Sequence, residues 1–192
     1  DAANNAGNSD LINSTEGVLY TEFSYLDTGY ISLNDGTNTN RLFLGFGGVQ
    51  VYTQVRVNLS VVADMAYGSY PKNEVVKAAI KYKANDFALW VNGVEVVVDS
   101  SGNTFPTNTL NQLSFNNGSS NPFYGNTKSV MVFKEALTDL ELEKLTGYNN
   151  HELYMNYYNR LSYLGLAEEY NVESDINNYI LWYQVYYKYQ VL

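Results

Sequence analysis

The sequence contains no cysteine and only one histidine, His151. The absence of cysteine excludes a disulfide framework, a thiolate zinc site and a cysteine nucleophile. One histidine cannot build a histidine-rich metal site, and it leaves a serine triad with a single possible base. No serine lies in a Gly-x-Ser-x-Gly turn, which is where a nucleophilic serine of the α/β-hydrolase kind would lie. We therefore interpret His151 as part of a structural helix.

Basic residues are also scarce, since 11 Lys and Arg stand against 20 Asp and Glu and the net charge is -9. A negatively charged chain is repelled by phosphate backbones and by anionic lipid surfaces. No apolar run is long enough to span a bilayer, and residues 1–16 are polar and unlike a signal peptide. We expect neither nucleic acid nor a membrane as a partner. Because the first residue is Asp1 and not methionine, we expect a fragment or processed product of a longer protein.

Tyrosine is abundant but unevenly distributed. Residues 1–147 hold 8 of the 19 tyrosines, and residues 148–192 hold the other 11. A shift in composition of this kind indicates a domain boundary. We predict a lead-in segment over residues 1–16, a main domain over residues 17–147 and a Tyr-rich extension over residues 148–192.

The main domain shows the period-2 alternation that is typical of β-strands. In one segment Val76, Ala78, Ile80 and Tyr82 share a face, and lysines lie on the opposite face, where we expect solvent. Further strands are predicted within residues 17–25, 41–46, 49–62, 87–91, 94–98, 110–115 and 129–133. Many short strands separated by Gly and Asn turns favour a mainly β sandwich or barrel.

One short helix interrupts this pattern. Thr138 and Glu141 are three residues apart and fit a capping box, in which each side chain accepts a hydrogen bond from the backbone N–H of the other residue. Gly147 is a suitable residue for the position after the helix. We predict a helix that begins near Thr138 and ends near Gly147.

Two runs of this domain carry a resemblance to a known family. Residues 81–94 (KYKANDFALWVNGV) resemble the central hairpin of laminin-G-like domains, and residues 133–142 (FKEALTDLEL) resemble their closing strand and short helix. Together with residues 121–125 (NPFYG), they are similar to versions found in tail-fibre and other virion proteins of bacteriophages. The resemblance covers residues 17–147 and implies the concanavalin-A-like lectin/glucanase superfamily. It implies a two-sheet antiparallel jelly roll and, commonly, glycan binding or adhesion, although many such domains are purely architectural.

The same superfamily includes glycoside hydrolases, which need two carboxylates at a fixed separation across the sugar. The only similar spacing is that of Asp139, Glu141 and Glu143, which falls in the predicted helix. Helical residues two apart point away from each other. Helix capping explains Asp139 and Glu141, so we predict no catalytic site and no enzyme.

Aromatic side chains and loop amides are the candidates for sugar binding, because sugars stack on aromatic rings and pair their hydroxyls with polar groups. Trp90 would lie on the face opposite Phe87, Leu89 and Val91, with its ring accessible between small and polar neighbours. The alternative is that the Tyr-rich extension covers it. The other candidates lie in two loops and are Tyr67, Tyr70, Asn116, Asn117, Asn121 and Tyr124. Plain turn chemistry is the alternative interpretation of both loops.

Some laminin-G-like relatives bind calcium through loop oxygens, and we therefore consider a calcium cofactor. Asp27, Asn34, Asp35 and Asp99 could supply such ligands, because Ca²⁺ prefers several oxygen atoms from loops. No EF-hand spacing is present, and Asn34-Asp35-Gly36 is also explained as a turn. The expected cofactor is none, with calcium as the alternative.

The extension has the composition of an interface. A helix is favoured in its first part, and residues 179–191 fit either a strand or a second helix. The segment has 11 Tyr but only five acidic and two basic residues, and interfaces are enriched in Tyr and depleted in Lys and Glu. We predict that it packs on its own domain, on a second copy or on another virion protein. Because trimeric fibres are common among the phage proteins that the chain resembles, a trimer is the favoured oligomer.

These observations predict a non-catalytic carbohydrate-binding or adhesion domain of a phage tail fibre or virion surface protein, in an extracellular setting. Its partner would be a cell-surface glycan or polysaccharide. The alternative is a structural assembly module without a glycan ligand, and a glycoside hydrolase is the more distant one. Binding to a glycan array would separate the first two, and release of sugar would support the third.

Overall fold

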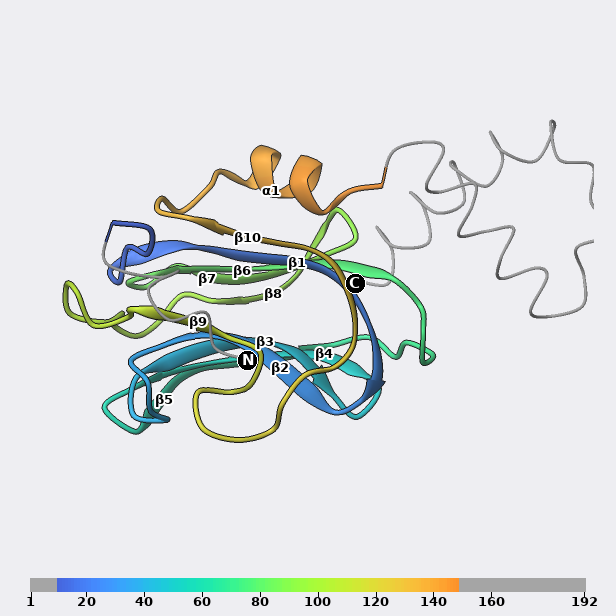
Figure 1. Cartoon of the computed structure of the whole chain (residues 1–192). Coiled ribbons are helices and arrows are strands. Elements are labelled where there is room, and N and C mark those ends of the chain that lie inside the picture. Colours follow the sequence, from blue (N-terminus) through green and yellow to red (C-terminus); the bar gives the residue numbers. More distant parts are fainter. Residues whose placement is uncertain (1–9, 149–192) are drawn as a thin grey trace, which may run out of the picture. The chain divides into compact units, whose positions relative to one another are not determined.

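The computed structural model describes residues 10–148, which form two five-stranded antiparallel sheets and one helix (Figure 1). The first sheet has the order β10-β1-β6-β7-β8 and the second has the order β5-β4-β3-β2-β9. The element bounds are β1 Glu16–Asp27, β2 Gly29–Asn34, β3 Arg41–Gly47, β4 Gln50–Val57, β5 Ser60–Tyr67, β6 Val76–Lys83, β7 Phe87–Val91, β8 Val94–Asp99, β9 Gln112–Ser114, β10 Tyr124–Phe133 and α1 Asp139–Thr146. The predicted mainly β, two-sheet sandwich with one short helix is confirmed.

The chain divides into two compact units, Asp1–Thr146 and Gly147–Leu192. The described residues include the whole sandwich. His151, the helix expected after it and residues 179–191 lie outside the described residues. Among residues 10–148, no helix is long and apolar enough to cross a membrane.

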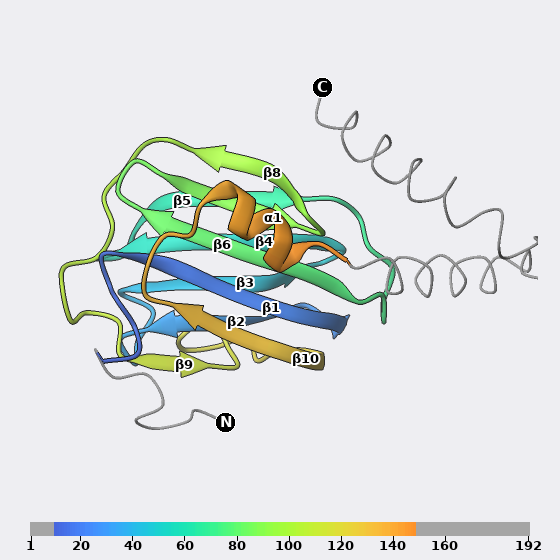
Figure 2. The same ribbon diagram turned by 90° about the horizontal axis from the view of Figure 1, so that it is seen from above.

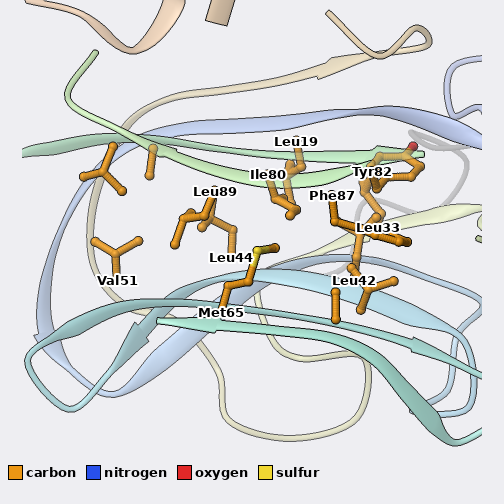
Figure 3. Close-up of a cluster of buried hydrophobic side chains, with 14 of the residues drawn as sticks. Leu19, Leu33, Leu42, Leu44, Val51, Met65, Ile80, Tyr82, Phe87 and Leu89 are labelled. Atoms are coloured by element: carbon orange, nitrogen blue, oxygen red, sulfur yellow. The ribbon is translucent and has the colours of Figure 1, made fainter. Parts of the chain in front are cut away.

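The core lies between the two sheets, where alternate residues of facing strands interdigitate. Figure 3 shows Leu19, Ile80 and Leu89 of the first sheet opposite Leu44 and Met65 of the second. The period-2 prediction for β6 is confirmed, since Val76, Ala78, Ile80 and Tyr82 are all buried in this core. Full burial of the larger aliphatic side chains, such as Val76 and Ile80, stabilises the fold by about 1.5–3 kcal/mol each.

The prediction that the lysines on the opposite face of β6 are solvated is confirmed only for Lys83, which is exposed. Lys77 and Lys81 are both buried. Lys81 Nζ lies 2.8 Å from Asp86 Oδ1 and 3.6 Å from Asp139 Oδ1, so its charge is neutralised at the edge of α1. Burial lowers the pKa of Lys81, but the hydrogen bond and charge of Asp86 and the charge of Asp139 outweigh it and raise that pKa above its ordinary value.

Helix α1 lies on the outer side of the first sheet (Figure 1) and begins with the predicted capping box. The Thr138 backbone N–H donates to Glu141 Oε2 over 2.8 Å, and the Glu141 backbone N–H donates to Thr138 Oγ1 over 3.4 Å. The Thr138 hydroxyl also donates to Glu141 Oε2 over 2.7 Å, and this bond together with the one from the Thr138 backbone N–H holds the pKa of Glu141 below its ordinary value. Leu142 and Thr146 point from the helix to the sheet and are buried. Helix α1 therefore covers part of the outer face of the first sheet, which the sequence pattern predicts to face solvent.

Candidate binding face

Trp90 is not an open stacking platform. It does point outward from the first sheet, as its position in β7 predicts, but its side chain is only 6% exposed. It packs with Val18, Tyr20 and Leu142, and Leu137 and Leu145 border the same cluster. The prediction that its ring is accessible is therefore wrong, because α1 covers it. The covering element proposed as the alternative, the Tyr-rich extension, is not needed to bury it.

Of the two tyrosine candidates near the loop between β5 and β6, one is not exposed. Tyr70 is buried in the core, its backbone carbonyl accepts a hydrogen bond from Tyr25 Oη over 2.7 Å, and its ring contacts Phe46 edge-on. Tyr67, the last residue of β5, is half-buried and packs against the core. The loop between β5 and β6 thus contributes at least one of its tyrosines to packing.

The second loop, between β9 and β10, is built largely by turn chemistry. Asn116 Oδ1 accepts from the Gly118 N–H over 2.7 Å, and Asn117 Oδ1 accepts from the Ser120 N–H over 2.9 Å. Asn117 is buried. Asn121 is exposed, and Tyr124 is 56% exposed at the start of β10. The structure therefore separates these candidates into two structural amides and two exposed side chains.

The four calcium candidates take part in local hydrogen bonds. Asp27 Oδ1 accepts from the Thr28 N–H, Asp35 Oδ1 accepts from Thr37 and Asp99 Oδ1 accepts from Ser101. Asn34 is buried and donates to two serine hydroxyls. No group of three His, Cys, Asp or Glu side chains that could hold a metal ion occurs among residues 10–148.

A different surface gathers the features that recognition needs, and it lies on the outer side of the second sheet. We call it the arginine–aromatic face and define it by Tyr30, Arg41, Phe43, Tyr52, Gln54 and Arg56. These residues alternate along β2, β3 and β4 with core residues such as Leu42 and Val55. They lie in rows across the strands: Tyr30, Gly45 and Tyr52 are register neighbours, as are Phe43 with Gln54 and Arg41 with Arg56.

Three aromatic rings of this face touch one another. The ring centroids of Tyr30 and Phe43 are 4.3 Å apart, those of Phe43 and Tyr52 are 5.4 Å apart, and those of Tyr30 and Tyr52 are 6.0 Å apart. Gly45 lies between Tyr30 and Tyr52 and has no side chain, so the two rings meet over it. Tyr30 and Phe43 are buried, whereas Tyr52 is half-buried. Tyr52 is therefore the ring through which this cluster meets solvent.

A chain of polar contacts runs beside these rings. Gln54 Nε2 donates to Tyr52 Oη over 3.0 Å, and Arg56 Nη2 donates to Gln54 Oε1 over 3.2 Å. The exposed carboxylate of Asp64, on β5, is a further hydrogen-bond partner of Tyr52. Burial and Asp64 raise the pKa of Tyr52 to about 12, while Gln54 opposes that rise. The phenol is therefore neutral at physiological pH and can both donate and accept a hydrogen bond.

The segment between β9 and β10 covers the part of the arginine–aromatic face that is formed by Tyr30 and Arg41. It crosses the second sheet on the side away from the first (Figure 1), and Figure 2 gives the view from above. Arg41 Nη1 donates to the backbone carbonyl of Asn117 over 2.7 Å, and Tyr30 pairs with Pro122 in an isolated bridge. Asn117 is the only sequence-predicted site residue that these contacts connect to the face, and it acts through its backbone.

The arginine–aromatic face was not predicted, because the outward residues of segments 41–46 and 49–62 were not assigned to a common surface. Arg41 and Phe43 alternate with Leu42 and Leu44, so the period-2 pattern could have indicated that they share the second face. Tyr30 could not be found in this way, because residues 29–34 were not predicted as a strand.

The sequence matches no protein-family model, and no curated protein matches it. Solved structures share its fold. A leech intramolecular trans-sialidase complexed with 2,7-anhydro-Neu5Ac is similar over 71% of this chain, with a TM-score of 0.58 and 16% identity. The match covers 24% of that protein, so this chain corresponds to about a quarter of its length.

Two further structures have similar sandwiches. Domain 4 of a GH43 extracellular arabinanase from Geobacillus stearothermophilus, in complex with arabinotriose, matches over 73% of this chain and 70% of that one, with a TM-score of 0.57 and 13% identity. Domains LG4-5 of the mouse laminin alpha1 chain match over 66% of this chain and 37% of that one, with a TM-score of 0.50 and 8% identity. At such identities the likeness establishes the fold alone, a jelly-roll β-sandwich, which the sequence resemblance had implied.

Proposed function

We propose that this chain is a non-catalytic carbohydrate-binding domain whose sugar contacts Tyr52, Arg56 and Asp64 on the arginine–aromatic face. The observation that carries this proposal is the position of Tyr52, a half-buried ring held by two other rings and flanked by hydrogen-bonding side chains. Sugars have apolar ring faces that pack on aromatic rings and hydroxyls that pair with polar groups. A ring fixed in advance loses little conformational entropy on binding, which favours affinity.

The fold comparisons support a binding role, because one structure with this sandwich was solved in complex with arabinotriose. The same proposal includes where the domain acts and how it associates. An extracellular place on a virion or tail fibre follows from the sequence resemblance, and trimeric association follows from that resemblance and from the composition of residues 148–192. Light scattering of the full chain measures the oligomer directly, and a monomer at high concentration would rule out the trimer.

Replacing Tyr52 with alanine is expected to weaken glycan binding about tenfold, which corresponds to about 1.4 kcal/mol, close to the value of an aromatic contact. Screening of the full chain on a glycan array identifies a ligand, and calorimetry then measures its affinity for the Tyr52→Ala and Tyr52→Phe variants. Because the phenylalanine variant keeps the ring, it should retain most of the binding.

Tyr124→Ala is the matched control, because Tyr124 is an exposed tyrosine on the first sheet. It should leave affinity unchanged. If Tyr124→Ala removes binding and Tyr52→Ala does not, the sugar binds at the loop before β10 and the proposed face is wrong. If no glycan on the array binds, the assembly-module alternative is favoured.

A further inference from the structure

Arg41 and Arg56 form a pair of like charges on neighbouring strands. They are direct register partners in the β3–β4 ladder. Arg41 is only 6% exposed, and Arg56 is half-buried. Like charges directly opposite each other in a sheet destabilise it, and charges withdrawn from water need compensation. A pair of this kind in a chain of net charge -9 therefore needs an explanation.

Within the described residues neither guanidinium has an acidic partner. Arg41 donates to the Asn117 carbonyl and lies over the Phe43 ring, with its Cζ atom 5.4 Å from the ring centroid. Arg56 donates to the Gln54 amide oxygen. Both contacts are to neutral groups. The nearby carboxylate of Asp64 is the hydrogen-bond partner of Tyr52, and no ion pair joins it to either arginine.

The hydrogen-bonding capacity of both side chains is also incomplete. The Nε atoms of Arg41 and Arg56 are buried and have no hydrogen-bond partner. Most buried polar groups in proteins are hydrogen-bonded, and an exception points to a water, an ion or a functional role. Guanidinium groups bind carboxylate and sulfate groups well, because their planar N–H donors match two oxygen atoms of the anion.

We propose that the Arg41–Arg56 pair is an anion subsite of the arginine–aromatic face, and that the ligand is an acidic glycan with a carboxylate or sulfate group. This inference rests on the proposed function and adds the class of ligand. The anionic group contacts Arg56, which is the more exposed of the two, and its charge compensates both guanidinium groups. The neutral part of the sugar packs on Tyr52, four residues before Arg56 on the same strand.

The test measures anion binding without a known glycan. The full chain is titrated with sodium glucuronate, glucose 6-sulfate or methyl glucoside at an ionic strength held constant with sodium chloride. The side-chain Nε–H resonances of Arg41 and Arg56 are followed by NMR. We expect a saturable shift with at least one of the two anionic sugars and none with methyl glucoside, and the responding sugar tells whether the group is a carboxylate or a sulfate.

Arg56→Gln should abolish this response at the Arg41 resonance, and Arg56→Lys should retain part of it, because it keeps the charge but loses the planar donors. Lys134→Gln is the matched control, since it removes one positive charge from an exposed site after β10 and should change nothing. If neither anionic sugar shifts the resonances, or if methyl glucoside shifts them equally, the subsite is wrong. Continued glycan-array binding in that case would leave the proposed function standing, whereas an empty array would remove both.

Discussion

Replacing Trp90 with alanine is expected to lower the free energy of unfolding by about 3–5 kcal/mol, the usual cost of deleting a buried aromatic side chain. Trp90 is 6% exposed and fills the space between the first sheet and α1, where Val18, Tyr20 and Leu142 surround it. The cavity would loosen the helix as well as the sheet. Urea unfolding followed by circular dichroism measures the effect, and glycan affinity of the folded variant should stay unchanged.

Two further variants test whether the loss of stability comes from removing the buried Trp90 ring. Trp90→Phe should cost much less than the alanine variant, because the Trp90 Nε1 atom has no hydrogen-bond partner to lose. Leu140→Ala, on the same helix but 59% exposed, should change stability by less than about 0.5 kcal/mol. A Trp90→Ala protein of normal stability that has lost glycan binding would contradict this account and restore Trp90 as a binding residue.

Trp90 also shows how far the sequence could lead. Alternation along β7 correctly placed its side chain on the face opposite Phe87 and Leu89, and the capping box correctly placed a helix after Thr138. Neither pattern says where that helix packs, because docking depends on contacts between residues about fifty positions apart. For this reason the sequence pattern wrongly predicts an accessible ring at Trp90 and a solvated side chain at Lys81.

The arginine–aromatic face depends on a strand and a register that the sequence pattern did not predict. The strands from β3 to β8 had counterparts in the sequence pattern, since apolar residues alternate there and Gly or Asn turns separate the segments, but β5 extends to Tyr67, five residues beyond the predicted segment 49–62. Strand β2 had none, although Ile31 and Leu33 point to the inner side. Because β2 was not predicted, the row of Tyr30, Gly45 and Tyr52 could not be predicted either. The proximity of Arg41 to Arg56 depends on the register of two strands, which alternation alone does not fix.

Replacing Gly45 with alanine is expected to lower the free energy of unfolding by about 2–3 kcal/mol, the upper part of the range for overpacking a core, and to weaken glycan binding. A Cβ atom at this position would collide with the Gly29 carbonyl oxygen and lie 2.8 Å from Tyr30 Cα. Both are backbone atoms of β2, so the strand itself must move and the rings of Tyr30 and Tyr52 must separate.

Gly47→Ala is the matched control, two residues further along the same strand. There the three atoms nearest to the added Cβ all belong to the Tyr52 side chain, the closest at 3.3 Å, and the ring can adjust by a few tenths of an ångström. We expect a stability change within about 1 kcal/mol and a smaller loss of affinity. Thermal unfolding and calorimetry of both variants test this order. Equal effects of the two substitutions would show that close contact of β2 and β3 at Gly45 does not organise the face, because Gly47→Ala leaves that contact intact.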